Sequence, residues 1–202
     1  MADRGLSDIF AAIAAVYRSE GREASFALAE ELSGFDRLDG WPLPEPCALD
    51  QAIRTCLSTS DQTVASAVLA GQSMIPWGVN PVENRMTRSA AAMVAVSTLL
   101  GPEGPIISKH ARMGLLYMCP NSYYPLHNHD ADETYVLVAG AALWTAGEDR
   151  RWRDAGDMIH HPSLMPHAFR TGDQGFVALW RWSGDINTHS YAFLPDAEAD
   201  QV

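Results

Sequence analysis

Two histidines and one glutamate lie close together near the middle of the 202-residue chain: His127, His129 and Glu133. In a β-strand, side chains two residues apart share a face, so these three residues and Tyr135 can point into one cavity if strand pairing continues without a slip. Neutral imidazole nitrogens and a carboxylate oxygen suit zinc, iron, manganese, cobalt or nickel. A strand with incidental polar residues is the alternative, but the glutamate on the same face favours a site for one divalent transition metal.

A second segment, residues 156–169, can supply one more ligand. It begins with a Gly-Asp turn, Pro162 interrupts it, and His167 follows where a new strand would begin. The two segments are separated by about the length of a β-hairpin and a loop, so His167 could return beside the first three residues as the fourth ligand. The remaining histidines are interpreted as structural, rim, core or surface residues: His160, His161, His110 and His189.

The two segments together resemble the cupin superfamily. The stretch "HNHDADETYVLVAG" has the first cupin pattern, in which His-x-His is followed by Glu133 and then by Gly140. The stretch "GDMIHHPSLMPH" has the second, with Gly-Asp, a proline and His167. The resemblance covers roughly residues 105–185. It implies a mostly β fold, a double-stranded β-helix barrel, that holds one divalent metal through His127, His129, Glu133 and His167.

A narrower resemblance is to the cupin dimethylsulfoniopropionate (DMSP) lyases of marine bacteria, closest to the DddQ type. Thr134 and Tyr135 follow the ligand glutamate, two tyrosines precede His-x-His, and a Trp-rich strand closes the barrel. The resemblance implies cleavage of DMSP, a small zwitterion, to dimethyl sulfide and acrylate. It makes Tyr135 and Tyr124 the candidate catalytic residues. Substrate binding is assigned to Trp182 and to Tyr123, with packing as the other role for Tyr123.

The implied elimination needs a base and a site for a sulfonium. Tyrosine has a reference pKa of about 10, but a nearby divalent cation favours its phenolate. Tyr135 lies two residues past a ligand on the same strand face, and Tyr124 is the rival base. Aromatic faces attract soft cations by about 0.5–2 kcal/mol. Trp180 and Trp182 share a strand face, and we expect Trp180 in the core and Trp182 at the pocket.

Two other functions use the same ligands, because a fold and its ligands do not name a reaction. One is a different metal cupin enzyme, such as an iron dioxygenase or an isomerase. The other is a non-enzymatic cupin that binds a small ligand. The net charge of -11 disfavours nucleic acid and anionic membrane surfaces as partners. A homodimer is possible, since cupin barrels commonly pair.

The cysteines and the hydropathy pattern indicate a cytoplasmic protein. Three cysteines at wide spacings, without a Cys-x-x-Cys pair, disfavour a disulfide framework. No apolar run approaches 18 residues, so no membrane-spanning segment is expected.

The elements that must position the site divide the chain into three parts. A helical N-terminal extension is expected at about residues 1–104, a cupin barrel at 105–195, and a frayed acidic tail at 196–202. Trp41 and Trp77 lie in Pro-rich loops and could cover the barrel mouth. Helices are predicted at residues 7–21, 22–35, 48–58, 63–72 and 87–101, and strands within 113–119, 134–147, 157–162 and 176–184.

Overall fold

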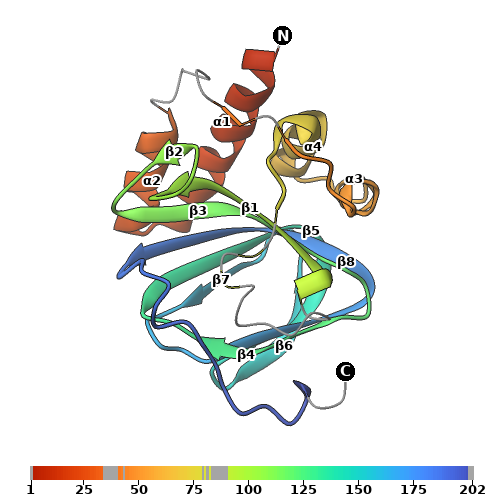
Figure 1. The fold of residues 1–202 in the computed structure, drawn as a ribbon, viewed down its shortest axis with the longest axis vertical. Coiled ribbons are helices and arrows are strands. Elements are labelled where there is room, and N and C mark those ends of the chain that lie inside the picture. Colours follow the sequence, from red (N-terminus) through yellow and green to blue (C-terminus); the bar gives the residue numbers. More distant parts are fainter. Residues whose placement is uncertain are drawn as a thin grey trace.

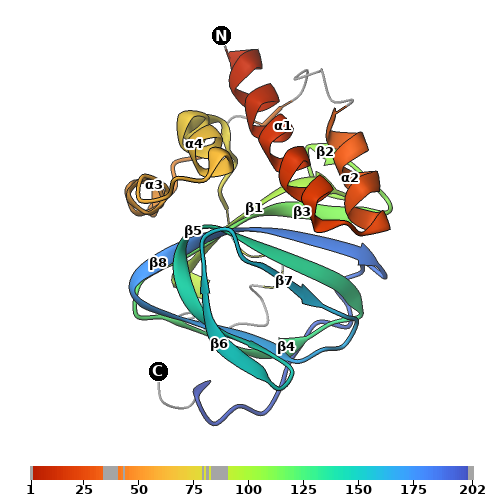
Figure 2. The same cartoon turned by 180° about the vertical axis from the view of Figure 1, so that it is seen from behind.

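The computed structural model describes residues 2–33, 41–42, 44–78, 80, 82 and 91–199. A group of helices lies on one side of a strongly curved sheet, and the strands that carry the motifs lie beneath them (Figures 1 and 2). The helices are α1 (Ala2–Glu20), α2 (Glu23–Ser33), α3 (Asp50–Leu57) and α4 (Thr63–Ala70), followed by a short 3₁₀ turn (Gln72–Met74).

The first four predicted helices are confirmed, with one change at the first helix. α1 buries a stripe at helical spacing that includes Ile9, Ile13 and Tyr17, all fully buried. The helix begins at Ala2, before the predicted start at residue 7. Gly21 ends α1 with φ +76°, a left-handed conformation that glycine adopts without a steric penalty. Within the described residues, no helix is long and apolar enough to cross a membrane.

In the described part of the chain, nine strands follow the helices and form one sheet. They are β1 (Val94–Gly101), β2 (Ile106–Ile107), β3 (Ala111–Met118), β4 (Tyr123–Asn128), β5 (Ala131–Ala146), β6 (Asp149–Asp154), β7 (Met158–His161), β8 (His167–Gly184) and β9 (Ala192–Phe193). The strand order is β2-β1-β3-β8-β4-β9, and β5 pairs with β6, β7 and β8. Among these described strands the hydrogen-bonded ladder is not closed into a ring. The sheet nevertheless curves around a cavity, as the predicted cupin barrel requires.

The two long strands β5 and β8 pair along most of their length and bend together. The register between them shifts around Val138 and again around Ala141. At this bend Gly140 has φ +74°, and an added Cβ atom would lie 2.0 Å from the carbonyl oxygen of Gly175. Only glycine fits such a close backbone approach. The glycine of the first motif therefore lets β5 and β8 stay paired on both sides of the bend.

Both faces of the central strands β1 and β3 are buried. On β3, Leu115 and Tyr117 face the helices and belong to a helix-side core. Their neighbours Leu116 and Met118 face inward and belong to a cavity-side core. The alternation follows from strand geometry, in which successive side chains point to opposite faces. The helices therefore cover the outer face of the strands whose inner face lines the site.

The helix predicted over residues 87–101 is wrong for Val94–Gly101, which forms β1. Residues 87–90 lie outside the described part of the chain. In β1, Ala95 contacts the helix-side core and Val96 the cavity-side core. A short apolar run buried on both faces loses its alternation, so periodicity does not distinguish it from a buried helix. The sheet thus begins before the predicted boundary at residue 104.

The tryptophans of the Pro-rich loops do not cover the cavity. The Trp41 ring lies 5.6 Å from that of Phe10, and its Nε1 donates to the carbonyl oxygen of Met74. Trp77 is buried in the same helix-side core. The prediction that they lie at the barrel mouth is wrong, because the large apolar rings pack where the helices meet the sheet.

The start of the acidic tail is anchored rather than frayed. The carboxylate of Asp196 accepts hydrogen bonds from the Tyr123 hydroxyl at 2.7 Å and from the Leu126 amide at 2.8 Å. Glu198 forms ion pairs with Arg150 and Arg170. The predicted tail thus includes residues that are tied to the barrel, and only residues 200–202 of it lie outside the described part.

Candidate active site

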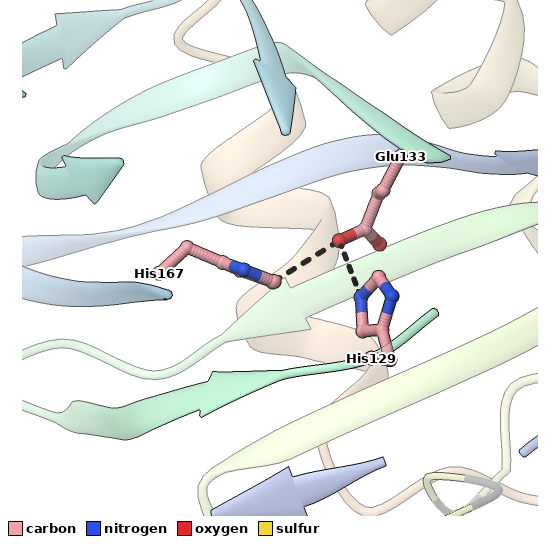
Figure 3. Close-up of side chains that lie close together, drawn as sticks. All are labelled: His129, Glu133 and His167. Atoms are coloured by element: carbon pink, nitrogen blue, oxygen red, sulfur yellow. Dashed lines mark hydrogen bonds and ion pairs between the residues drawn. The ribbon is translucent and has the colours of Figure 1, made fainter. Parts of the chain in front are cut away.

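Three buried side chains of the predicted ligand set converge inside the barrel: His129, Glu133 and His167 (Figure 3). Their ligand atoms all lie within 4.8 Å of one another. Glu133 Oε2 is 3.1 Å from Nε2 of His129 and 3.1 Å from Nε2 of His167. Two imidazoles and one carboxylate form a donor set typical of zinc, iron and related divalent metals.

The donor atoms of this group leave coordination capacity for a cation. His167 Nε2 is buried and forms no hydrogen bond with any group in the described residues, although Glu133 lies beside it. Burial alone would raise the pKa of Glu133, but the electrostatic influence of His129 and the neighbouring ring nitrogens of His161 and His167 outweigh it. The pKa of Glu133 is therefore held well below its usual value. A buried carboxylate beside imidazole nitrogens fits a bound divalent metal.

Strand register explains why the three residues meet. His129 follows the end of β4, Glu133 is near the start of β5, and His167 is the first residue of β8. His167 pairs with His127 across β4 and β8, as the prediction of a new strand at this position requires. Because β8 bends, its C-terminal half lies beside Glu133. Trp182 in that half is the direct cross-strand partner of Glu133.

His127 lies beside this group without belonging to it. Its ring centroid is 4.0 Å from that of His167 and 6.4 Å from that of His129. Its Nδ1 contacts the carbonyl oxygen of Pro125 at 2.8 Å, which leaves Nε2 as the nitrogen with a free lone pair. Burial and the neighbouring His167 lower the pKa of His127 well below its ordinary value, so the ring is neutral. The structure thus places the fourth predicted ligand next to the group of three.

Both tryptophans of β8 line the cavity. Trp182 donates from Nε1 to Glu133 Oε1 at 2.7 Å, and its ring centroid lies 4.3 Å from that of His129. Trp180 also lines the cavity, contrary to the expectation that only Trp182 does so. Trp180 and Trp182 are two residues apart on β8, and such residues lie on the same face of a strand, so both rings face the cavity. Gly114 lies against β1 and the Trp180 ring, since an added Cβ would lie 1.8 Å from the carbonyl oxygen of Ser97 and 3.0 Å from the ring.

Tyr135 lies on the same face of β5 as Glu133 and lines the same cavity. Its ring packs 5.0 Å from that of Trp144 and 5.7 Å from that of Phe169. Burial and the negative charge of Glu133 raise the pKa of Tyr135 well above its ordinary value. Both effects favour the protonated phenol over the phenolate.

Tyr124 lines the cavity from β4 and belongs to a hydrogen-bonded group that the sequence did not reveal. Its hydroxyl accepts from Nδ2 of Asn80 at 2.9 Å and lies 2.8 Å from the hydroxyl of Tyr191. The Tyr191 ring stacks on that of His127 at 5.1 Å. Burial raises the pKa of Tyr124 and of Tyr191. Tyr191 follows the last predicted strand, and no motif in the sequence marks it.

Tyr123 is not brought to the site. It precedes Tyr124 on β4, so its side chain points to the opposite face of the strand. Its hydroxyl donates to Asp196, and the guanidinium of Arg170 lies 4.2 Å from its ring centroid. Tyr123 is not among the residues that line the cavity, and these contacts favour the packing role over substrate binding.

His161, predicted as a structural or rim residue, is buried behind Glu133. Its Nδ1 lies 3.5 Å from Glu133 Oε2, and its Nε2 accepts a hydrogen bond from Trp144 Nε1 at 3.0 Å. Burial and His167 lower the pKa of His161 to about 3. Its partner in the β5–β7 ladder is Glu133, a register that the sequence alone does not specify. The other histidines outside the motifs, His110 and His189, are exposed as expected.

Arg112 is a cationic side chain in the cavity lining. It stands opposite Trp182 in the β3–β8 ladder. The guanidinium donates to the carbonyl oxygen of Ile186 at 2.7 Å and binds the carboxylate of Glu103 through both terminal nitrogens. The exposed carboxylate of Glu103 therefore compensates the charge of Arg112 from the solvent side. Because Arg112 lies outside both motifs, no pattern in the sequence marks it.

Comparisons with known proteins agree with this geometry. A family model described as dimethylsulfoniopropionate lyase matches residues 27–178. Dimethylsulfoniopropionate lyase DddQ of Ruegeria pomeroyi is 30% identical over 185 residues, which are 87% of this chain and 92% of that protein. A putative dimethylsulfoniopropionate lyase DddL of Cereibacter sphaeroides is 31% identical over 122 residues, 59% of this chain and 50% of that one.

Solved structures show the same similarity in three dimensions. The crystal structure of the DMSP lyase DddQ from Ruegeria pomeroyi superposes with a TM-score of 0.70 at 27% identity, covering 96% of this chain and 98% of that one. A chain in the crystal structures of the DMSP lyases RdDddP and RnDddQII gives a TM-score of 0.71 at 20% identity, covering 96% and 100%, and shows the shared fold. Since the family model spans most of the chain and a relative aligns over nearly its whole length, the chain belongs to the dimethylsulfoniopropionate lyase family.

Proposed function

We propose that this protein is a metal-dependent carbon–sulfur lyase that cleaves DMSP to dimethyl sulfide and acrylate by base-catalysed β-elimination. The observation that carries the proposal is the convergence of His129, Glu133 and His167 in the cavity that Tyr135 and Trp182 also line. Ligands, a phenol and aromatic faces are the three features that this elimination needs.

The proposed cofactor is one divalent transition metal, with zinc, iron, manganese, cobalt and nickel all compatible with the donor set. His129, Glu133 and His167 hold it, and His127 offers Nε2 as the fourth ligand. When bound, the cation withdraws charge from the substrate carboxylate and so makes the adjacent C–H more acidic.

Tyr135 is the proposed base. As phenolate, its oxygen takes the proton from the carbon next to the substrate carboxylate. The electron pair of that C–H bond forms the C=C bond of acrylate, and the C–S pair leaves with neutral dimethyl sulfide. Tyr124 is the alternative base, but its hydroxyl is already engaged with Asn80 and Tyr191, whereas Tyr135 lies beside Glu133.

The aromatic side chains that line the cavity suit the sulfonium end of the substrate. Trp180, Trp182 and Tyr191 present rings to the same space, and each good cation–π contact contributes about 0.5–2 kcal/mol. Because Glu103 compensates the charge of Arg112, this cation does not oppose the binding of a sulfonium nearby. The cavity lining combines aromatic rings with charged and polar side chains, which suits a zwitterionic ligand.

The decisive test is headspace gas chromatography after purified, metal-loaded protein is mixed with DMSP, together with liquid chromatography for acrylate. We expect equal amounts of dimethyl sulfide and acrylate, and almost none from the Glu133→Ala variant. Folded, metal-loaded protein that releases no dimethyl sulfide would contradict the proposal. Oxygen consumption by the iron form in that case would indicate a dioxygenase.

Two further predictions concern the environment of the enzyme. A cytoplasmic location is supported by the free thiols of Cys47, Cys56 and Cys119. A homodimer remains a prediction that light scattering on the purified protein can test.

A further inference from the structure

His161 occupies a special place beside the proposed metal site. It is 1% exposed, and its ring stacks on that of the ligand His167 at 4.1 Å with an interplanar angle of 16°. Its Nδ1 faces Glu133 Oε2 at 3.5 Å and forms no closer hydrogen bond within the described residues. A neutral imidazole in this place could act either as a ligand or as a hydrogen-bond donor.

Trp144 decides between these two roles. An indole N–H can only donate, so Nε2 of His161 must be the acceptor of the 3.0 Å hydrogen bond between them. A doubly protonated ring is excluded by the same contact, because its Nε2 would also be a donor. The single ring proton must then be on Nδ1, which faces the carboxylate of Glu133.

A histidine that is protonated on Nδ1 has no lone pair there to give a cation. Ligation through Nδ1 would require the ring proton to move to Nε2, where it would meet the N–H of Trp144. The Trp144 ring is held in place by stacking on Phe169, with centroids 4.5 Å apart and planes at 27°. The indole therefore has little freedom to turn its N–H away.

We propose that Trp144 locks His161 as the Nδ1–H tautomer, and that His161 is a positioning residue that orients the carboxylate of Glu133 instead of binding the metal. The proposal rests on the metal site of the proposed function. Glu133 is then held from two sides, with the Trp182 N–H on Oε1 and the His161 N–H facing Oε2. Loss of such a partner commonly lowers metal affinity about 10- to 100-fold.

The arrangement depends on the bend in β5. Glu133 pairs directly with His161 of β7, while Trp144 lies in the other half of β5, beyond the bend at Gly140. Because β5 bends between these two residues, the same strand supplies Glu133 and Trp144. Trp144 orients His161, and His161 in turn faces Glu133.

The first test is the tautomer itself, measured on the metal-free full-length protein by long-range ¹H–¹⁵N correlation NMR of labelled histidine. We expect His161 to have its proton on Nδ1 and a lone pair on Nε2. A proton on Nε2 would overturn the proposal, whatever the variants below do. In Trp144→Phe we expect the preference for the Nδ1–H form to weaken.

The second test compares metal affinity in variants by competitive Zn²⁺ titration without substrate. His161→Leu should bind Zn²⁺ about 10- to 100-fold more weakly than the parent protein. His161→Asn should stay within about threefold of the parent, because its side-chain amide can donate from near the position of Nδ1. Unchanged affinity in His161→Leu, or equal losses in both variants, would contradict a positioning role.

His160→Leu is the matched control, because His160 precedes His161 on β7 and points to the opposite face. Its Nε2 lies 3.4 Å from Asp132 Oδ2, away from Glu133, and its replacement should leave Zn²⁺ affinity unchanged. Both readouts are independent of dimethyl sulfide release. A protein that shows the expected tautomer and affinities but does not cleave DMSP would contradict the proposed function alone.

Discussion

Trp182 and Glu133 face each other across the β5–β8 ladder, and the indole N–H of Trp182 donates to Glu133 Oε1 at 2.7 Å. The same indole ring lines the cavity. One side chain thus connects the proposed metal ligand with the proposed wall of the substrate pocket, and its two contributions can be separated by substitution.

Trp182→Phe keeps an aromatic ring but removes the hydrogen bond to Glu133. We expect metal affinity to fall about 10-fold, the lower end of the usual loss for a ligand's hydrogen-bond partner. Trp182→Leu should in addition raise the KM for DMSP, since the face that attracts the sulfonium is lost. Metal titration and steady-state kinetics measure the two effects, and a Phe variant with parental metal affinity would show that the hydrogen bond has no such role.

Tyr135→Phe should lower kcat by about 100- to 10,000-fold, the usual contribution of a general base. Metal content and melting temperature should stay near those of the parent, because only a hydroxyl is lost. Tyr124→Phe is the comparison, and it should lose less activity, since its hydroxyl is bonded to Tyr191 and Asn80. If Tyr124→Phe is inactive while Tyr135→Phe is nearly normal, the two roles must be exchanged.

His127→Ala tests whether the fourth predicted ligand is equivalent to the others. The ligand atoms of His129, Glu133 and His167 lie together, and His127 stands beside them. We therefore expect His129→Ala to abolish stoichiometric metal and His127→Ala to weaken metal binding to a lesser degree. Elemental analysis after dialysis, followed by metal titration, gives both results. Full metal retention in His129→Ala would contradict the site.

The ion pair between Glu20 of α1 and Arg181 of β8 should stabilise the contact between the helices and the barrel. Nη2 of Arg181 lies 2.8 Å from Glu20 Oε1, and the side chains are 0% and 4% exposed. Removing one partner of a buried pair leaves an unpaired charge and commonly costs about 3–5 kcal/mol. Glu20→Ala should lower the free energy of unfolding in urea by this amount.

A surface pair provides the control for that measurement. Glu30 pairs with Arg18 at 3.1 Å, with side chains 76% and 43% exposed. Exposed pairs contribute about 0–1 kcal/mol, so Glu30→Ala should change unfolding very little. Similar losses in Glu20→Ala and Glu30→Ala would show that the buried pair does not anchor the helices.

The pair of Glu103 and Arg112 should contribute to stability in a pH-dependent way. The hydrogen bond from Arg112 lowers the pKa of Glu103 below its ordinary value. A lowered pKa in the folded state means that the contribution is present at neutral pH and is lost as the pH falls through the folded pKa. Glu103→Gln should be slightly less stable than the parent at pH 7, by less than about 1 kcal/mol because Glu103 is exposed. The difference should shrink as the pH falls below the ordinary glutamate pKa of about 4.3, and a constant difference across the range would contradict the linkage.

The sequence determined the chemistry of the ligands and much of the secondary structure. The spacing of His129 and Glu133, and the strand that begins at His167, can be read from the motifs because strand parity is a local property. Helix periodicity gave α1 to α4 for the same reason. Residue parity also predicted that Trp180 and Trp182 share a strand face. It did not predict that this face lines the cavity.

Only the tertiary structure decided which side chains meet across strands. Pairing of β5 with β7 places His161 behind Glu133, and the chain after β8 returns Tyr191 to Tyr124. The strand β1 looked helical because both of its faces are buried, which removes the alternation that marks a strand. Cross-strand register and the covering of a sheet's second face depend on distant parts of the chain, and a local pattern contains no information about either.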